Sequence, residues 1–211
     1  MYALAENRSL PEMAAPVRAE PQPDQTIGEL FSDFQPVSLE RTNELARMLS
    51  RIDNKYVVQR DQLLALVPQL RGAFDILDIQ DQRAFTYDTR YFDDAARSAY
   101  FEHHQGKRRG FKVRVRNYVD GSISFLDVKV KGQRGMTENY RMPYDLEDLA
   151  ALTTDASDFA EQTYSRQYDK AFDYCLRPSL DVRYQRMTLV ARAGGERMTI
   201  DTDLRFQSED R

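Results

Sequence analysis

The sequence has no tryptophan and only one cysteine, Cys175. A single cysteine excludes an internal disulfide and a cysteine-rich metal site, and it is typical of proteins from a reducing compartment. No apolar run approaches the roughly 20 residues that cross a bilayer, and the N-terminus lacks the charged start and apolar core of a secretory signal. These absences predict a cytoplasmic protein without direct membrane insertion.

An excess of positive charge is also missing, because the formal net charge is −4. Domains that bind nucleic acids are usually basic, so we expect no nucleic-acid partner. Cations are nevertheless concentrated in one segment, residues 107–116, which contains Lys107, Arg108, Arg109, Lys112, Arg114 and Arg116. A basic segment inside an acidic protein indicates a focused anion site rather than a long electrostatic surface.

The chain divides into a tail and one domain. Residues 1–25 carry four prolines among Ala, Glu and Gln, a composition that predicts a flexible tail. Residues 26–211 predict a single α+β domain. We expect helices over 27–34, 39–49, 60–70, 94–105, 146–152 and 159–174. We expect strands over 51–59, 74–79, 85–92, 110–119, 122–131, 139–143, 179–191 and 197–206.

Two pairs of these strands carry turn signals typical of hairpins. Asp120-Gly121 separates the strands over 110–119 and 122–131, and it is the strongest short hairpin signal in the chain. Gly194-Gly195 separates the last two strands in the same way. The sequence therefore predicts an antiparallel β-structure.

The first hairpin alternates cations with apolar residues. Residues two apart in a strand share a face, so Lys112, Arg114 and Arg116 should point away from the apolar residues between them. The partner strand repeats the pattern with Asp127, Lys129 and Lys131. Its plainest interpretation is a half-exposed sheet with solvated charges.

Recurrence of the pattern favours a binding role instead. Arg51, Asp53 and Lys55 carry a similar mix of charges and alternate with Ile52. Arg197, Thr199 and Asp201 alternate with Met198 and Ile200, and Arg183 or Arg186 adds a further cation. Arginine suits bidentate recognition of phosphate, and cations that meet on one surface need an anion to offset their repulsion. A ligand with several phosphates is the expected counter-charge.

The carboxylates on this surface have two open interpretations. Asp53, Asp127 and Asp201 could hold Mg²⁺ or Mn²⁺, because both metals accept oxygen ligands. Each could equally form a local salt bridge with a neighbouring Arg or Lys. The aromatic residues within 85–92 are interpreted as core strand residues rather than as a stacking platform.

Six segments together resemble the VTC domain, the polyphosphate polymerase domain of vacuolar transporter chaperone proteins and their bacterial relatives. They are RIDNKYVV (51–58), FTYDTRYFDD (85–94), HHQGKRRGFKVRVRNY (103–118), FLDVKVKG (125–132), VRYQR (182–186) and RMTIDTDLRF (197–206). The resemblance runs from about residue 40 to residue 206. It places the chain in the triphosphate tunnel metalloenzyme superfamily.

This resemblance implies an antiparallel β-barrel, or tunnel, with flanking helices and a basic interior. Residues 26–211 would then be a VTC-like polyphosphate polymerase domain. It would bind ATP, polyphosphate or triphosphate and transfer the γ-phosphate of ATP to a polyphosphate chain with Mn²⁺ or Mg²⁺. The oligomeric state is not implied.

The motifs also assign residues. The resemblance implies catalytic contacts with phosphate oxygens from Lys55, Arg114, Arg116, Lys129, Arg186 and Arg197. Their neighbours on the basic strands give further expected phosphate-binding residues, which are Arg51, Lys112, Lys131 and Arg141. The expected metal ligands are Asp127 and Asp201.

Three departures from the family pattern leave the activity open. Asp127-Val128-Lys129 replaces the family's E-x-K, and Asn139 stands where a lysine usually precedes Arg141 by two residues. The sequence ends at Arg211, before the strand whose glutamate binds the metal in the family, so we expect a tunnel that is incomplete at its C-terminal side. Three interpretations are open: a truncated form, an edge that a partner supplies, or a degenerate domain.

Because of these departures, other functions than polyphosphate synthesis stay open. One alternative is a catalytically inactive module that binds polyphosphate or triphosphate. Triphosphate hydrolysis is less favoured, because Arg51-x-Asp53-x-Lys55 lacks the paired glutamates of hydrolases with an E-x-E-x-K strand. A structural protein with a solvated basic sheet is a further alternative.

Overall fold

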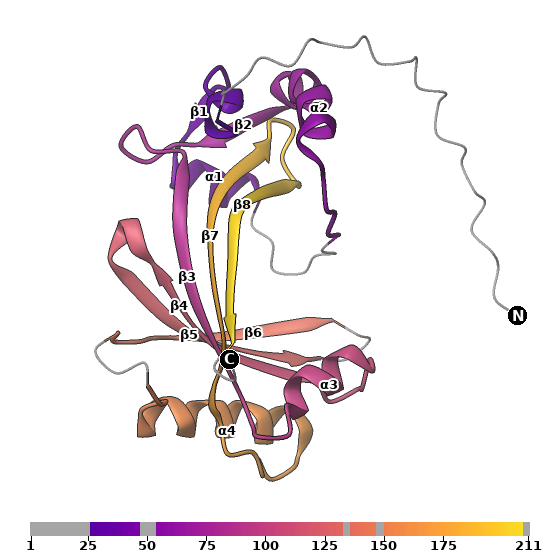
Figure 1. Cartoon of the computed structure of the whole chain (residues 1–211), viewed down its shortest axis with the longest axis vertical. Coiled ribbons are helices and arrows are strands. Elements are labelled where there is room, and N and C mark those ends of the chain that lie inside the picture. Colours follow the sequence, from indigo (N-terminus) through magenta and orange to yellow (C-terminus); the bar gives the residue numbers. More distant parts are fainter. Residues whose placement is uncertain (1–25, 47–53, 133–135, 147–149, 209–211) are drawn as a thin grey trace, which may run out of the picture.

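The computed structural model describes residues 26–46, 54–132, 136–146 and 150–208 (Figure 1). The predicted tail over residues 1–25 lies outside the described residues, as do Arg51 and Asp53.

Helices and strands follow the predicted mixture. The helical elements are η1 (Gly28–Phe31), α1 (Leu39–Leu45), α2 (Arg60–Ala73), α3 (Ser98–His104), η2 (Val119–Gly121) and α4 (Thr154–Tyr168). The strands are β1 (Pro36–Val37), β2 (Phe74–Leu77), β3 (Ala84–Asp93), β4 (Phe111–Tyr118), β5 (Ile123–Lys131), β6 (Thr137–Pro143), β7 (Arg177–Ala191) and β8 (Arg197–Ser208). No helix in these ranges is both long enough and apolar enough to cross a membrane.

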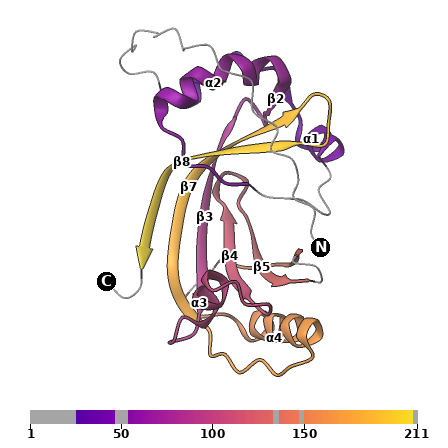
Figure 2. The ribbon, with the colours of Figure 1, turned by 90° about the vertical axis from the view of Figure 1, so that its right-hand side faces the viewer.

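All eight strands belong to one sheet. Its order is β1-β2-β7-β3-β4-β5-β6, and β8 also pairs with β7. Only the short β1–β2 pair is parallel; the other pairs are antiparallel. Figures 1 and 2 show that the sheet curls into a half-barrel with helices around it. The predicted α+β class, with a tunnel-like antiparallel sheet and flanking helices, is confirmed.

Both predicted hairpins are present. β4 pairs with β5 in a register that places Arg114 opposite Asp127, and the 3-10 turn η2 joins them, with Ser122 in the left-handed region after it. β7 pairs with β8 through a turn in which Gly194 and Gly195 have φ values of 78° and 80°. Glycine adopts this backbone region without a steric penalty, which explains the two glycines at the turn.

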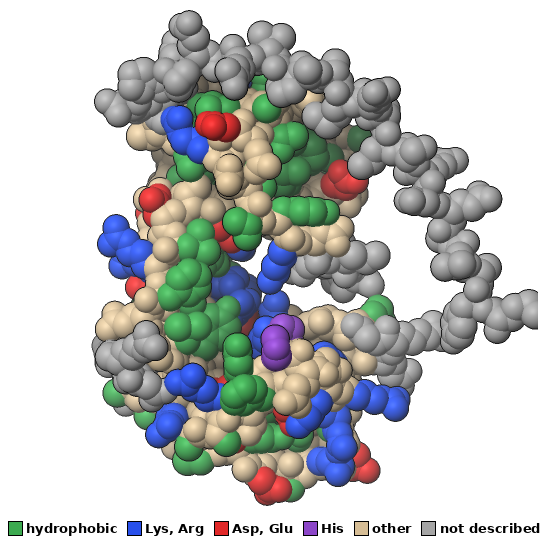
Figure 3. Space-filling view, turned by 45° about the vertical axis from the view of Figure 1, so that its right-hand side comes forward, with side chains coloured by type: hydrophobic (Ala, Val, Ile, Leu, Met, Phe, Trp, Pro, Cys, Tyr) green, Lys and Arg blue, Asp and Glu red, His purple; other side chains and the backbone are tan. Residues whose placement is uncertain are grey.

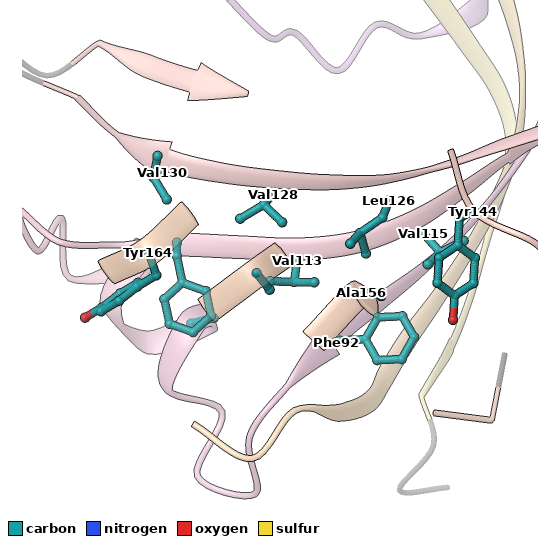
Figure 4. Close-up of a cluster of buried hydrophobic side chains, with 12 residues drawn as sticks. Phe92, Val113, Val115, Leu126, Val128, Val130, Tyr144, Ala156 and Tyr164 are labelled. Atoms are coloured by element: carbon teal, nitrogen blue, oxygen red, sulfur yellow. The ribbon is translucent and has the colours of Figure 1, made fainter. Parts of the chain in front are cut away.

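The larger core lies between the β4–β5 hairpin and α4 (Figure 4). Six side chains of the hairpin are at most 2% exposed; they are Phe111, Val113, Val115, Leu126, Val128 and Val130. Ala156, Ala160 and Tyr164 on α4 pack against them. The apolar half of the alternating pattern therefore faces α4 and the charged half faces the other way, which confirms the predicted separation of the two faces.

A second core joins the N-terminal elements to the other end of the sheet. Phe31 and Phe34 pack with Val67 of α2, Ile76 of β2 and Leu189 of β7. Arg83 donates hydrogen bonds to the backbone carbonyls of Phe31, Ser32 and Phe34 and pairs with Asp78 at 2.9 Å. This arginine therefore fixes the segment after η1 to the turn between β2 and β3.

Two predicted elements differ from the structure. Residues 54–59 are irregular and exposed rather than a strand, and no strand in the described ranges pairs with them. The predicted helix over 146–152 is also wrong, because the described residues 146 and 150–152 are not helical.

The following helix lies further toward the N-terminus than expected. α4 begins early because the Thr153 hydroxyl accepts a hydrogen bond from the Ala156 N–H, and it ends where Asp169 adopts a left-handed conformation. Beyond this point the chain turns so that Phe172 and Tyr174 pack against Phe111, with ring centroids 5.4 and 4.7 Å apart.

Candidate functional site

The face of the sheet opposite α4 carries the cations. We call it the concave face, and Figure 3 shows Lys and Arg side chains gathered in a hollow beside a histidine. The register places many charged and aromatic side chains on this side of the sheet, among them Tyr87, Tyr91, Lys112, Arg114, Arg116, Asp127, Lys129, Arg141 and Arg186. The site is therefore built on β3, β4, β5, β6 and β7.

Asp127 is the buried centre of one half of this face. Its side chain is 0% exposed. One carboxylate oxygen accepts hydrogen bonds from Nε and Nη2 of Arg114 at 3.1 and 3.0 Å. The other accepts from Nε of Arg141 at 2.7 Å and from the Asn139 amide at 3.3 Å. Burial opposes ionisation, but the hydrogen bond from Arg141 and the charge of Arg114 outweigh it and hold the pKa of Asp127 below its ordinary value.

Tyrosines support the two arginines of this cluster. Arg114 donates from Nη1 to the Tyr91 hydroxyl at 3.3 Å, and Arg141 donates from Nη2 to the Tyr118 hydroxyl at 3.2 Å. Burial alone would raise the pKa of Tyr91, but the charge of Arg114 and this hydrogen bond lower it below its ordinary value. The two guanidinium groups are therefore held in fixed positions.

The other half of the concave face is centred on Tyr87. Its ring centroid lies 5.5 Å from the guanidinium carbon of Arg116 and 5.1 Å from that of Arg186. Tyr184 stacks on Tyr87 at 5.2 Å and lies 5.1 Å from Arg186. Distances of this size are typical of cation–π contacts.

The two arginines beside Tyr87 differ in their partners. Arg186 forms a bidentate pair with Asp201, with distances of 2.6 and 2.7 Å. The Nε of Arg116 is buried and has no hydrogen-bond partner within the described ranges. Because a buried donor without a partner is costly, Arg116 is a candidate for a hydrogen bond to an external acceptor.

Lysines crowd the end of β4 nearest α3. Lys112 lies opposite Lys129 in the register. Burial lowers the pKa of Lys112, and the charges of Lys55, Arg114 and Lys131 lower it further, against the opposing effect of Tyr91. Burial and the charges of Lys112, Lys131 and Lys55 also lower the pKa of His103. Lys55 therefore lies near this end of the site, although it is not in a strand.

The sequence-predicted residues fall into three groups. Lys55, Arg114, Arg116, Lys129 and Arg186 lie on or beside the concave face, together with Lys112 and Arg141. Lys131 shares this side but donates from Nζ to the Lys107 carbonyl at 2.7 Å. Arg197 pairs with Val190, which lies four residues along β7 from Arg186. At the usual rise of a strand these two positions of β7 are about 13 Å apart, so Arg197 lies beyond the cluster around Arg186.

The tyrosines of β3 are functional candidates that the sequence interpretation missed. Tyr87 and Tyr91 contact the cations of the concave face, so their interpretation as core strand residues was wrong. Their spacing of four residues places them on one side of a strand, and the register of β3 on β4 aligns Tyr91 with Arg114. That spacing was the available signal.

The two expected metal ligands, Asp127 and Asp201, already accept hydrogen bonds from other side chains. Arg114, Arg141 and Asn139 occupy both oxygens of Asp127, and Arg186 occupies both oxygens of Asp201. Within the described part of the chain, no three His, Cys, Asp or Glu side chains come together in a metal-binding group. These carboxylates do not form a metal site by themselves, and binding of Mn²⁺ or Mg²⁺ stays a prediction.

Comparison with known proteins agrees with the motifs. A family model of the VTC domain matches residues 50–211, which is more than half of the chain. No curated protein sequence matches significantly. A VTC domain implies a function related to polyphosphate in general terms. The chain therefore belongs to the VTC domain family.

Proposed function

We propose that the concave face binds the triphosphate of ATP together with the end of a polyphosphate chain, and that the protein extends this chain. The observation that carries the proposal is the set of cations around Arg116, whose buried Nε has no hydrogen-bond partner within the described ranges. A phosphate oxygen supplies both the missing acceptor and the missing negative charge.

The reaction would be a phosphoryl transfer. A terminal oxygen of the polyphosphate chain attacks the γ-phosphorus of ATP and forms a new P–O bond. The bond from the γ-phosphorus to the β–γ bridging oxygen breaks, and ADP leaves with the electron pair. Catalysis of such a transfer rests mainly on positioning and on stabilisation of charge on the phosphate oxygens.

The cations of the concave face would have different roles in this reaction. Arg116 and Lys112 would contact phosphate oxygens directly, and Arg186 would add positive charge across the ring of Tyr87. Arg114 would act from a fixed position, because Asp127 and Tyr91 hold its guanidinium group. No role as metal ligand is assigned to Asp127 or Asp201, since arginines already occupy their oxygens.

The test uses purified protein with ATP, added Mn²⁺ and a short polyphosphate primer. We expect longer polyphosphate on a gel and one ADP released for each phosphate added. Arg116→Ala should lower kcat/KM about tenfold or more, as expected when a charged hydrogen bond to the transferred group is lost. Arg71→Ala is the matched control, because Arg71 lies on α2 and pairs with the exposed Asp33.

A second candidate function is binding without turnover. It is favoured by the occupied oxygens of Asp127 and Asp201, which leave the described carboxylates paired with arginine. Polyphosphate affinity that survives chelation and is lost in Lys112→Ala/Arg116→Ala, without release of ADP, would support this function.

The same assay separates the remaining alternatives. Release of orthophosphate without a longer polymer would indicate triphosphate hydrolysis. Affinity no higher than nonspecific binding at physiological salt would contradict any phosphate-binding role and would leave a structural one.

A further inference from the structure

A pocket of about 520 Å³ lies away from the concave face. It is bounded by the connection from α3 to β4 and by the segment after α4, and we call it the loop pocket. Tyr164 and Tyr174 line it, and both rings pack against Phe111, which lies on the α4 side of β4. Figure 2 shows α3 and α4 together at this end of the molecule. The tyrosine wall of the loop pocket therefore lies on the side of β4 opposite the cations of the concave face.

Cations outnumber carboxylates around the loop pocket. Lys107, Arg108, Arg109 and Lys170 line it, together with Glu102 and Asp173. Arg108 and Arg109 are exposed, and no described carboxylate forms an ion pair with either of them. These two residues belong to the basic segment of the sequence, but the concave face does not use them. Their charge is therefore available to an anion from solution.

Glu102 needs a hydrogen-bond donor, whereas the cations of the loop pocket need an anion. Its Oε2 is buried and lacks a hydrogen-bond partner among the described residues. Its Oε1 lies 3.9 Å from Nζ of Lys107, which is too long for a hydrogen bond. A buried acceptor without a donor is unfavourable, so the pocket calls for a ligand that also donates a proton.

We propose that the loop pocket binds orthophosphate, a phosphate that retains a proton near neutral pH. Anionic oxygens of the phosphate accept hydrogen bonds from Arg108, Arg109 and Lys170. Its P–OH donates to Oε2 of Glu102. This site is independent of the proposed function, because it shares no residue with the concave face.

The proton requirement makes the pocket selective. Sulfate carries no proton near neutral pH, and the internal phosphates of a polyphosphate chain carry none either. Both would place an acceptor against the acceptor oxygen of Glu102, which is repulsive. The concave face is chemically different, because it presents cations to a chain that is fully ionised.

The experiment measures binding of inorganic phosphate and of sulfate to the full chain at equal ionic strength near pH 7. Titration calorimetry is carried out on Lys112→Ala/Arg116→Ala, so that the concave face contributes little. We expect phosphate to bind at least about tenfold more tightly than sulfate. Adding Arg108→Ala/Arg109→Ala should weaken phosphate binding about tenfold or more, the loss expected from charged hydrogen bonds. Adding Arg71→Ala should leave it unchanged.

Glu102→Gln tests the selectivity itself. The glutamine amide can donate to sulfate, so the preference for phosphate over sulfate should fall toward one. Amide NMR shifts locate the ion: we expect phosphate to shift residues 105–110 and 169–174.

Three outcomes would overturn the proposal. They are equal affinities for phosphate and sulfate in the unmodified pocket, shifts confined to residues 112–116, and phosphate binding that survives Arg108→Ala/Arg109→Ala. Failure of the proposed function is recognised separately, because it would abolish ATP-dependent polymer in the unmodified protein while leaving orthophosphate binding intact.

Discussion

The two faces of the β4–β5 hairpin differ in how completely the protein itself satisfies their side chains. On the α4 side, six apolar side chains are at most 2% exposed and pack against one helix. On the concave side, cations are half-buried and share few anions. One face can therefore stabilise the fold by itself, whereas the other leaves the buried Nε of Arg116 without a hydrogen-bond partner in the described ranges. Asp127 is the exception, because it is charged and fully buried.

Asp127→Ala removes the fully buried charge of the concave face, and it is expected to have the largest effect on the unfolding free energy. Removing this carboxylate leaves Arg114 and Arg141 without their shared anion, and breaking a buried ion pair costs about 3–5 kcal/mol of unfolding free energy. Denaturant unfolding measures the loss. Asp201→Ala is the control, because its pair with Arg186 is partly exposed and should contribute about 1 kcal/mol or less. Equal losses in the two variants would contradict a special role for Asp127.

Leu126→Ala tests whether a change in the apolar face alters stability without altering polyphosphate affinity. Leu126 is 0% exposed, and truncation of a buried leucine costs about 2–5 kcal/mol because it leaves a cavity. Polyphosphate affinity, measured where the variant is still folded, should change less than about twofold, since no phosphate contact is removed. A large loss of affinity would show that the two faces are not separable.

Arg116→Ala should produce the opposite result. Loss of its cation–π contact with Tyr87 should change the unfolding free energy by about 1 kcal/mol or less, while polyphosphate affinity at fixed salt should fall about tenfold or more. Arg116→Lys keeps the charge but loses the bidentate geometry. Its polyphosphate affinity should therefore lie between those of the unmodified protein and Arg116→Ala. If Arg116→Ala lowers stability as much as Leu126→Ala, this arginine is structural.

Mild acid should produce the smallest effect, because the lowered pKa of Asp127 means that its carboxylate is protonated only in part. The pKa of Asp127 is lower in the folded protein than its ordinary value, so the folded state binds fewer protons in this range. Its contribution to stability is therefore present above about pH 4, near the ordinary pKa of an aspartate, and is lost as the pH falls through the folded value. Asp127→Asn should flatten this part of the stability curve. An unchanged pH dependence would mean that other carboxylates dominate it.

Local sequence patterns predicted the hairpin that carries both faces. Alternation fixed the two sides of β4 and β5, and Asp120-Gly121 marked the turn between them. The same alternation in residues 51–59 predicted a strand, but the described residues 54–59 have no partner strand in the described ranges. A strand needs a neighbour for its backbone, and that requirement is not visible in a local pattern.

Contacts between distant strands could not be predicted in the same way. The sequence left Asp127 open as a metal ligand or a salt-bridge partner. Its choice depends on β6, which brings Arg141 alongside it from 14 residues away. The cation contacts of Tyr87 likewise depend on β3 lying between β4 and β7. Such neighbours follow from the sheet order rather than from spacing along the chain.

Tyr87 also bears on the thermodynamics of binding. Its ring lies against Arg116 and Arg186 and limits their rotation before any ligand arrives. The conformational entropy that a long arginine would lose on binding has then largely been lost on folding. Affinity for a polyanion should therefore depend chiefly on the counterions released from ligand and protein, with a steep and linear dependence on the logarithm of salt concentration.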